Sequence, residues 1–354
     1  MRRLIAVLLF GAMGLAAADR AKNVILFLGD GTGPSTVNAA SIHGYGEPRS
    51  LYIQNMPHIG LSEASSASSW VSDSASGMTA IVTGEKTHNG VISQASDAER
   101  KVRDGRALKT ILEYAEEHGL STGVVSNSSM ADATPAACYA HANDRGKHGE
   151  IFAQVLTPRF GDGVDVVIGP GRPSILKLTA ELGVDLAAEL PKKGFVFLDN
   201  LEAVKGLDGE TRRVVALFDS GEFDLAAAAN AAIAILSRNP NGFFLMVESN
   251  NHSKNVKQTL DRTVTFDKII RNTAERFKQD TLILFTADHS YDLRLPKGAK
   301  GADIVPLVAV DGSHSAEEVL VAATGPGAEQ VKGIFPNTQI FHIMLSAFGW
   351  SQKR

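Results

Sequence analysis

The chain of 354 residues has only one cysteine, Cys138. A single thiol excludes an intramolecular disulfide, so the stability of the fold must come from its hydrophobic core or from bound metal. Within the stretch "PAACYAH" we expect Cys138 to be a small buried apolar side chain rather than a reactive thiol.

The chain also lacks a strong excess of charge of either sign. Its formal net charge is −4 at pH 7, and its basic residues are scattered rather than clustered. Proteins that bind polyanions usually concentrate lysine and arginine on one surface. The sequence therefore gives no indication of a nucleic-acid partner.

Long hydrophobic runs are missing after residue 18, and the one at the N-terminus is short. It follows the basic start "MRR" and ends with "AAA" just before Asp19. These features predict a secretory signal peptide over residues 1–18. Because the run is too short to span a bilayer comfortably, we expect no membrane anchor and a secreted or periplasmic protein.

Linkers, repeats and low-complexity tracts are absent as well, so residues 19–354 are expected to form a single domain. Continuous apolar runs alternate with helical patterns, which predicts an α/β fold: a doubly wound, mostly parallel central sheet with helices on both faces. The expected strands cover residues 23–29, 121–126, 165–171, 194–198, 212–218, 242–249, 281–288 and 305–310. Helical patterns cover residues 107–118, 257–277 and the stretch 224–242 before the next strand.

Polar side chains stand where several of these strands end. Asp30 closes "NVILFLGD", Glu248 closes "FFLMVE", and Asp288 and His289 close "LILFTADH". In open α/β sheets, ligands bind at the edge where the carboxyl ends of the strands meet. Each of these residues alone is also compatible with a turn or a helix cap. Together they are residue types that hold divalent metals, zinc and magnesium among them.

Three further residues of suitable types fall near the same edge. Asp132 and Thr134 follow the expected strand 121–126 within a short loop, and His314 follows "VPLVAVDGS". We expect these side chains to join the same site.

The stretch "WVSDSASGMTA" (70–80) has two interpretations. Ser74 can be the N-cap of a short helix, where its side-chain oxygen accepts a hydrogen bond from a free backbone N–H. It can also be a nucleophile, but short serine motifs often match by accident. The stretch by itself leaves both interpretations open.

Six stretches, taken together and in order, resemble the alkaline phosphatases. They are "LFLGDG", "VSDSASGMTA", "ADATPAACYAHANDR", "FFLMVE", "LFTADHS" and "SHSAEEV". The resemblance covers essentially the whole chain after residue 18. It implies an exported, metal-dependent phosphomonoesterase that acts on small phosphate esters through a phosphoserine intermediate, with Mg²⁺ and one or two Zn²⁺ ions.

The resemblance also implies a role for each matching residue. Ser74 is the implied phosphate-accepting nucleophile, and Arg145, at the end of the helix after "TPAA", is the implied residue that grips the phosphate. Asp73, beside Ser74, can orient Arg145 or can be an exposed helix cap. The implied zinc site that activates the serine consists of Asp30, Asp288 and His289. The implied magnesium site consists of Asp132, Thr134 and Glu248, with Asp30 shared. His314 is the implied ligand of a second zinc.

The second zinc site departs from the family pattern. An aspartate and a histidine of the family correspond, without gaps, to Ser253 and Lys257, and neither is a good zinc ligand in this setting. The remaining donor nearby is His252, which is equally compatible with a surface position. Lys254 or Lys257 can instead bring an ammonium group to the phosphate.

This departure leaves alternative functions open. One is a phosphodiesterase or another esterase of the same superfamily, and another is a phosphate-binding protein with a degenerate second metal site. A sulfatase is disfavoured, because Ser74 is not followed by the Pro and Arg of the sulfatase nucleophile motif. The oligomeric state is also open, with a homodimer as one candidate.

Overall fold

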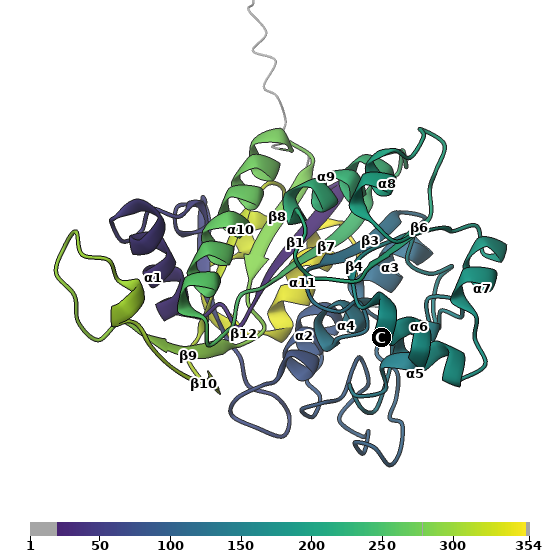
Figure 1. Cartoon of the computed structure of the whole chain (residues 1–354), viewed down its shortest axis with the longest axis horizontal. Coiled ribbons are helices and arrows are strands. Elements are labelled where there is room, and N and C mark those ends of the chain that lie inside the picture. Colours follow the sequence, from purple (N-terminus) through teal and green to yellow (C-terminus); the bar gives the residue numbers. More distant parts are fainter. Residues whose placement is uncertain (1–19, 278, 352–354) are drawn as a thin grey trace, which may run out of the picture.

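The protein is described by a computed structural model that covers residues 20–277 and 279–351. The predicted signal peptide, residues 1–18, lies outside the described residues. A ten-stranded sheet runs through the described part of the chain, in the order β12-β2-β11-β8-β1-β7-β3-β4-β6-β5 (Figure 1). Its strands are β1 (Asn23–Asp30), β2 (His58–Glu63), β3 (Ser121–Ser126), β4 (Val166–Pro170), β5 (Val196–Leu198), β6 (Val214–Phe218), β7 (Phe243–Asn250), β8 (Thr281–Thr286), β11 (Val319–Thr324) and β12 (Gly333–Pro336).

The sheet is mostly parallel, as predicted. Every pair from β8 through β1, β7, β3, β4 and β6 to β5 is parallel. Only β11 runs antiparallel, between β8 and β2, and β12 is parallel to β2. The sequence interpretation did not include β2, β11 and β12, which form one end of the sheet.

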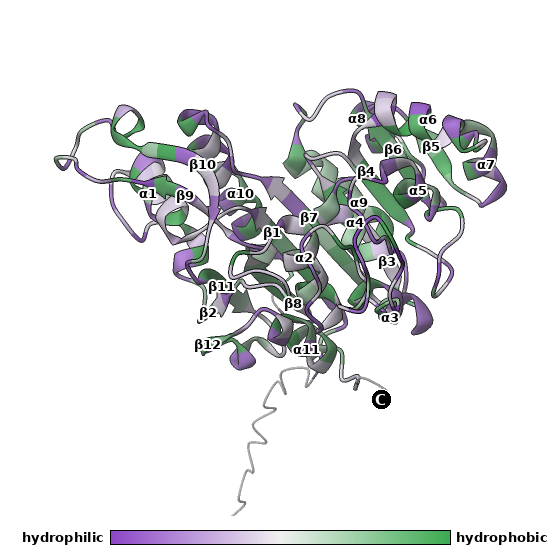
Figure 2. Ribbon diagram, turned by 90° about the horizontal axis from the view of Figure 1, so that it is seen from below, coloured by the Kyte–Doolittle hydropathy of each residue, from purple (hydrophilic) through white to green (hydrophobic). Residues whose placement is uncertain are grey.

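Helices cover both faces of the sheet. The helices are α1 (Pro34–Tyr45), α2 (Ser74–Thr83), α3 (Ile111–Glu117), α4 (Ala133–Tyr139), α5 (His148–Ala153), α6 (Arg172–Glu181), α7 (Leu186–Lys192), α8 (Leu201–Lys205), α9 (Leu225–Leu236), α10 (Val256–Arg276) and α11 (Thr338–Ala347). Apolar residues of α2–α7 and α11 form one core, and those of α1 and α8–α10 form the other. Figure 2 shows the hydrophobic colour gathered on the strands between these layers.

The central strand β1 explains why two cores form. All eight of its residues are buried. Val24 and Leu26 belong to one core, and Ile25 and Phe27 belong to the other. Since successive side chains of a strand point to opposite faces, a continuous apolar run needs a layer of helices on each side. The doubly wound α/β fold is therefore confirmed.

Two local predictions were wrong. The run 305–310 is not a buried strand, because Val305–Leu307 is a 3₁₀ turn and the following strand β10 (Ala309–Ser315) pairs with β9 (Ser290–Arg294) outside the central sheet. The helix expected from residue 107 begins only at Ile111, because Thr110 accepts a hydrogen bond from the backbone N–H of Glu113 and caps the helix.

Two smaller findings complete the fold. Cys138 is fully buried in α4, as expected, and burial raises the pKa of its thiol. Within residues 20–277 and 279–351, no helix has both the length and the apolar character that crossing a membrane requires.

Candidate active site

The site lies beyond the carboxyl ends of three neighbouring central strands. Asp30 is the last residue of β1, Glu248 lies near the end of β7, and Asp288 and His289 follow β8 after one intervening residue. Because β7, β1 and β8 are adjacent in the sheet, these ends meet at one edge. The structure therefore brings these residues together at the edge where the sequence analysis expected them.

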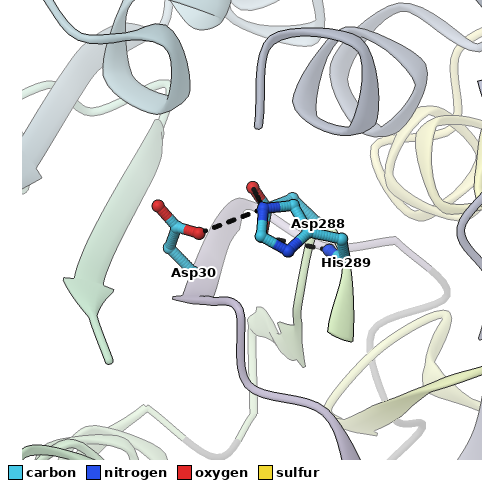
Figure 3. Close-up of side chains that lie close together, drawn as sticks. All are labelled: Asp30, Asp288 and His289. Atoms are coloured by element: carbon cyan, nitrogen blue, oxygen red, sulfur yellow. Dashed lines mark hydrogen bonds and ion pairs between the residues drawn. The ribbon is translucent and has the colours of Figure 1, made fainter. Parts of the chain in front are cut away.

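Asp30, Asp288 and His289 form a compact buried cluster (Figure 3). Each offers a ligand atom, and these atoms lie within 4.8 Å of one another. Nε2 of His289 lies 3.4 Å from Oδ1 of Asp30 and 3.4 Å from Oδ2 of Asp288. Backbone N–H groups of Gly31 and His289 donate to Oδ1 of Asp288, at 3.2 and 3.1 Å, and fix the orientation of that carboxylate.

Three buried carboxylate oxygens at this edge have no hydrogen-bond partner among the described residues. They are Oδ1 of Asp30, Oδ2 of Asp288 and Oε1 of Glu248. Imidazole nitrogens lie 3.2–3.4 Å from the first two oxygens without making hydrogen bonds to them. Burying carboxylate oxygens without hydrogen bonds is costly, and a bound cation offsets that cost. Carboxylate oxygens together with an imidazole are donors that zinc accepts. The residues of the cluster therefore fit a divalent metal.

The carboxyl groups influence one another strongly. Burial, reinforced by the charge of Asp30, raises the pKa of Asp288 to about 6. The same two causes raise the pKa of Glu248 well above its usual value. Burial also acts on Asp30, but contact with His252 and the nearby imidazoles outweighs it and holds the pKa of Asp30 below its usual range. Such divergent values are typical of sites built to hold charge.

Ser74 is the first residue of α2, and it is not the helix cap. Asp73 is the N-cap, because its Oδ1 accepts from the backbone N–H of Ser76 at 3.0 Å. The hydroxyl of Ser74 is left free for another contact, and its Oγ lies 3.4 Å from Nε2 of His289. The N-terminal end of a helix also favours negative charge.

Arg145 points at the same helix end, between two carboxylates. Its Nη1 donates to Oδ2 of Asp73 at 3.1 Å and its Nη2 to Oδ1 of Asp132 at 2.9 Å. Burial opposes the charge of the guanidinium, but the two aspartates outweigh it and raise the pKa of Arg145. The sequence placed Arg145 at the end of the helix after "TPAA", which is wrong. Helix α4 ends at Tyr139, and Arg145 lies in the loop beyond it.

The residues of the expected magnesium site stand close to this cluster without forming a tight group. Asp132 is the N-cap of α4 and pairs with Arg145, and Thr134 is buried in the first turn of that helix. Glu248 accepts a hydrogen bond from the hydroxyl of Ser126 at the end of β3. Among the described residues, the metal-sized cluster of acids and histidines contains only Asp30, Asp288 and His289.

Two more histidines approach the cluster from the side of β9 and β10. Nε2 of His252 lies 3.2 Å from Oδ1 of Asp30. The ring of His314 stacks on that of His289, with centroids 3.6 Å apart. Nδ1 of His314 lies 3.1 Å from the carbonyl oxygen of Ser72, which leaves Nε2 free when Nδ1 is the donor.

The surroundings shift the pKa values of these two imidazoles in opposite directions. Burial lowers the pKa of His252, but contact with Asp30 outweighs it and raises the value to about 9. Burial lowers the pKa of His314, and the charge of His289 lowers it further.

Ser253 and Lys257, which the sequence comparison without gaps assigns to two ligand positions of the family, make local contacts instead. Oγ of Ser253 accepts from the backbone N–H of Asn255 at 3.1 Å. Nζ of Lys257 pairs with Oδ2 of Asp261 at 2.5 Å on the exposed side of α10. Neither side chain is therefore placed as a ligand.

Sequence reasoning missed two serines that shape the site. The hydroxyl of Ser72 donates to the backbone carbonyl oxygen of Asp288 at 3.1 Å, and the backbone carbonyl oxygen of Ser72 contacts Nδ1 of His314. Ser126 holds Glu248. Ser126 ends a predicted strand, so the strand-end signal that found Asp30 could have found it too.

This combination defines an α/β protein with a candidate metal centre beside a serine. Comparison with known proteins then identifies the family, because the family model described as alkaline phosphatase matches residues 21–310. The chain belongs to the alkaline phosphatase family. It is an enzyme of that type, a hydrolase of a metal-dependent family.

Individual relatives agree with this assignment. The tissue-nonspecific alkaline phosphatase of Rattus norvegicus is 29% identical over 88% of this chain and 72% of its own length. The alkaline phosphatase of Escherichia coli strain K12 is 26% identical over 93% of this chain and 86% of its own length. Most positions of this chain therefore differ from those of the two relatives, although the matches extend over most of each chain.

Solved structures agree as well. Alkaline phosphatase from the Antarctic bacterium TAB5 matches with a TM-score of 0.77 at 29% identity, over 94% of this chain and 99% of that one. A mutant of the same enzyme, solved with Mg bound in a site called M3, gives the same TM-score at 30% identity over the same shares of both chains. The shared fold thus extends over nearly the whole of both chains.

Proposed function

We propose that this chain is an exported, metal-dependent phosphomonoesterase that works through a phosphoserine at Ser74. The observation that carries the proposal is the position of the Ser74 hydroxyl, 3.4 Å from His289 in a buried cluster with unpaired carboxylate oxygens. Ser74 gives up its hydroxyl proton to solvent and attacks the phosphorus, so that a bond between its Oγ and phosphorus forms while the ester P–O bond breaks and the leaving oxygen takes a proton from solvent. A water then loses a proton and attacks the phosphorus, its oxygen forming a new P–O bond while the bond between phosphorus and Oγ of Ser74 breaks, and Oγ takes a proton back.

The charges around Ser74 support this role. A phosphate monoester carries two negative charges, and a guanidinium can bind two of its oxygens side by side. Arg145 is kept charged and oriented by Asp73 and Asp132. In the proposal, Arg145 exchanges part of these contacts for the phosphate, and the N-terminus of α2 adds its partial positive charge.

The proposal also includes the metal ligands that the family resemblance implies. Asp30, Asp288 and His289 would hold Zn²⁺, while Asp132, Thr134 and Glu248, with Asp30 shared, would hold Mg²⁺. His314 and His252 would serve a second zinc position. When bound, the metals favour the alkoxide of the serine and neutralise phosphate charge.

A second candidate function is favoured by one observation. The side chains of Ser253 and Lys257 make local contacts with Asn255 and Asp261, so in this proposal the second zinc position lacks two ligands that the family pattern supplies. A phosphodiesterase or other esterase of the superfamily, or a phosphate-binding protein without turnover, would be compatible with such a site. Lys254 packs on β10, since a Cβ added at Gly312 would lie 2.6 Å from its Cε.

The remaining expectations are part of the same proposal. Residues 19–354 form one catalytic domain, residues 1–18 direct export to the periplasm or the medium, and a homodimer is a candidate assembly. The substrates are small phosphate esters. Expression with and without residues 1–18, followed by cell fractionation and light scattering, tests the location and the assembly.

One experiment separates the candidate functions. Steady-state hydrolysis of an aryl phosphate monoester and of an aryl phosphate diester is measured with and without a chelator, beside equilibrium binding of inorganic phosphate. A phosphomonoesterase prefers the monoester and loses activity with chelator. Diester preference would favour the second candidate, and phosphate binding without turnover would favour a binding protein.

A further inference from the structure

Arg145 is held by a turn from another part of the chain. Its backbone N–H donates to the carbonyl oxygen of Gly90 at 2.8 Å. The backbone N–H of Gly90 donates to Oδ1 of Asp73 at 3.1 Å, and the other oxygen of Asp73 accepts from the Arg145 guanidinium. Gly90 therefore touches both Arg145 and the carboxylate that orients it.

A second arginine fastens this turn to the Arg145 loop. Nε of Arg100 donates to Oδ1 of the buried Asp144 at 2.9 Å, and Asp144 directly precedes Arg145. A Cβ added at Gly90 would lie 2.3 Å from Cζ of Arg100, so the guanidinium rests directly on the glycine. Gly90 also has a φ of 82°, which a side chain at that position would strain.

The same two segments meet once more beside these contacts. Ile92 and Ala142 form an isolated antiparallel bridge, with hydrogen bonds of 2.8 and 3.0 Å in the two directions. Residues 90–92 and 142–145 thus lie side by side, and Arg100 closes the end next to the site. The Arg100 side chain is nearly half exposed, so its own burial adds little to the core.

We infer that Arg100 is a positioning residue for Arg145. Arg100 donates a hydrogen bond to Asp144 and packs on Gly90. These contacts keep the Arg145 backbone and the Asp73 carboxylate in one arrangement before phosphate binds. A pre-organised guanidinium loses less freedom on binding, so it binds phosphate more tightly. This inference rests on the proposed function, because it assumes that Arg145 binds phosphate.

Binding of inorganic phosphate to the metal-loaded protein, measured by calorimetry, tests the inference. Arg100→Ala should weaken phosphate binding by about three- to tenfold. This is the range expected when the lost charged hydrogen bond does not touch the phosphate but only positions the residue that does. Arg100→Lys keeps the charge but not the planar fork, and should restore part of the affinity. Arg103→Ala removes an exposed arginine three residues after Arg100 and should leave the phosphate affinity unchanged.

A double-mutant cycle separates positioning from general stability. In an Arg145→Ala background, Arg100→Ala should cause no further loss of phosphate affinity, because it acts through Arg145. A merely structural role would give additive losses and a lowered Tm in both backgrounds. Asp144→Asn, which removes only the charge, provides the same comparison if Arg100→Ala fails to fold.

The possible results point to different failures. Equal phosphate affinity of the wild type and Arg100→Ala, or additive losses in the cycle, would overturn the inference and leave the proposed function intact. A wild-type protein that neither binds nor hydrolyses phosphate compounds would overturn the proposed function, and this inference with it.

Discussion

Nε2 of His252 lies 3.2 Å from Oδ1 of Asp30, so His252 faces the buried cluster rather than solvent. Its ring centroid is 6.0 Å from that of His289 and 5.9 Å from that of His314. Ser253 instead accepts a hydrogen bond from the backbone N–H of Asn255. In the proposed function, the second zinc position is therefore left with the two imidazoles of His252 and His314.

This arrangement should give two metal sites of unequal strength. Two imidazoles and water hold zinc more weakly than a set that includes a carboxylate. Metal titration of the apoprotein should show one tight zinc site, at Asp30, Asp288 and His289, and one weaker site. Loss of even an outer-shell partner costs about 10–100-fold in metal affinity, so His252→Ala and His314→Ala should each weaken the second site at least that much.

Neither substitution removes a ligand of the tight site, although His252 contacts Asp30 and His314 stacks on His289, so the second site should lose more affinity than the tight site in each variant. Two equally tight sites that are indifferent to both substitutions would contradict the assignment. Phosphate release from Ser74 should also be slow until zinc is added in excess, which rapid-quench kinetics can follow.

Ser74→Ala should fold and bind metal but lose at least about a thousandfold in kcat, because the covalent step is removed. Acid quenching during turnover should trap a phosphoprotein in the wild type and none in the variant. Ser174→Ala, an exposed serine on α6, is the matched control and should behave like the wild type. Full activity of Ser74→Ala would remove Ser74 from the mechanism.

Arg145→Ala should weaken inhibition by inorganic phosphate and lower kcat/KM by about 10- to 100-fold. The reason is the loss of roughly 1.5–3 kcal/mol of charged hydrogen bonding to the phosphate. Arg145→Lys should recover only part of this, since an ammonium cannot bind two oxygens as a planar fork does. If phosphate inhibits all three proteins equally, Arg145 does not bind it.

Much of the fold could be predicted because buried parallel strands have a plain signature. The run "NVILFLG" is apolar without interruption, and the structure buries every residue of β1. Strand β12 has only four residues and is largely exposed, so its sequence carries no such signal. The run 305–310 is apolar too, but it leads into an exposed hairpin, and composition alone could not separate the two cases.

The site also contains some residues whose positions could be predicted from the sequence and others whose positions could not. Asp30 and Asp288 could be predicted because their strands deliver them to one edge of the sheet. The position of Arg145 depends on a loop that packs against Gly90, a contact between segments far apart in the sequence. Such a contact leaves no local pattern. His252 was ambiguous for the same reason, because its role depends on the path of the chain after β7.

A buried acid outside the cluster makes the stability of the fold depend on pH in the alkaline range. Glu116 on α3 is only 6% exposed, its Oε1 accepts from the hydroxyl of Thr122, and its Oε2 has no hydrogen-bond partner among the described residues. Burial, with the nearby acids Asp162 and Asp165, raises the pKa of Glu116 from 4.5 to about 9. The folded protein therefore holds this proton at pH values where the unfolded chain has lost it.

The sign of the effect follows from this difference in proton binding. Below pH 4.5 both states are protonated, and between 4.5 and about 9 the folded state binds more protons, so the free energy of unfolding falls as pH rises. Glu116→Gln removes the titration, so its stability relative to the wild type should increase by on the order of 4 kcal/mol as the pH rises from 6 to 10. Urea denaturation at both pH values measures the gain. Glu117→Gln, at the more exposed neighbouring position paired with Lys109, is the control. If the Glu116→Gln and wild-type stabilities stay parallel from pH 6 to 10, the folded protein does not retain a proton on Glu116.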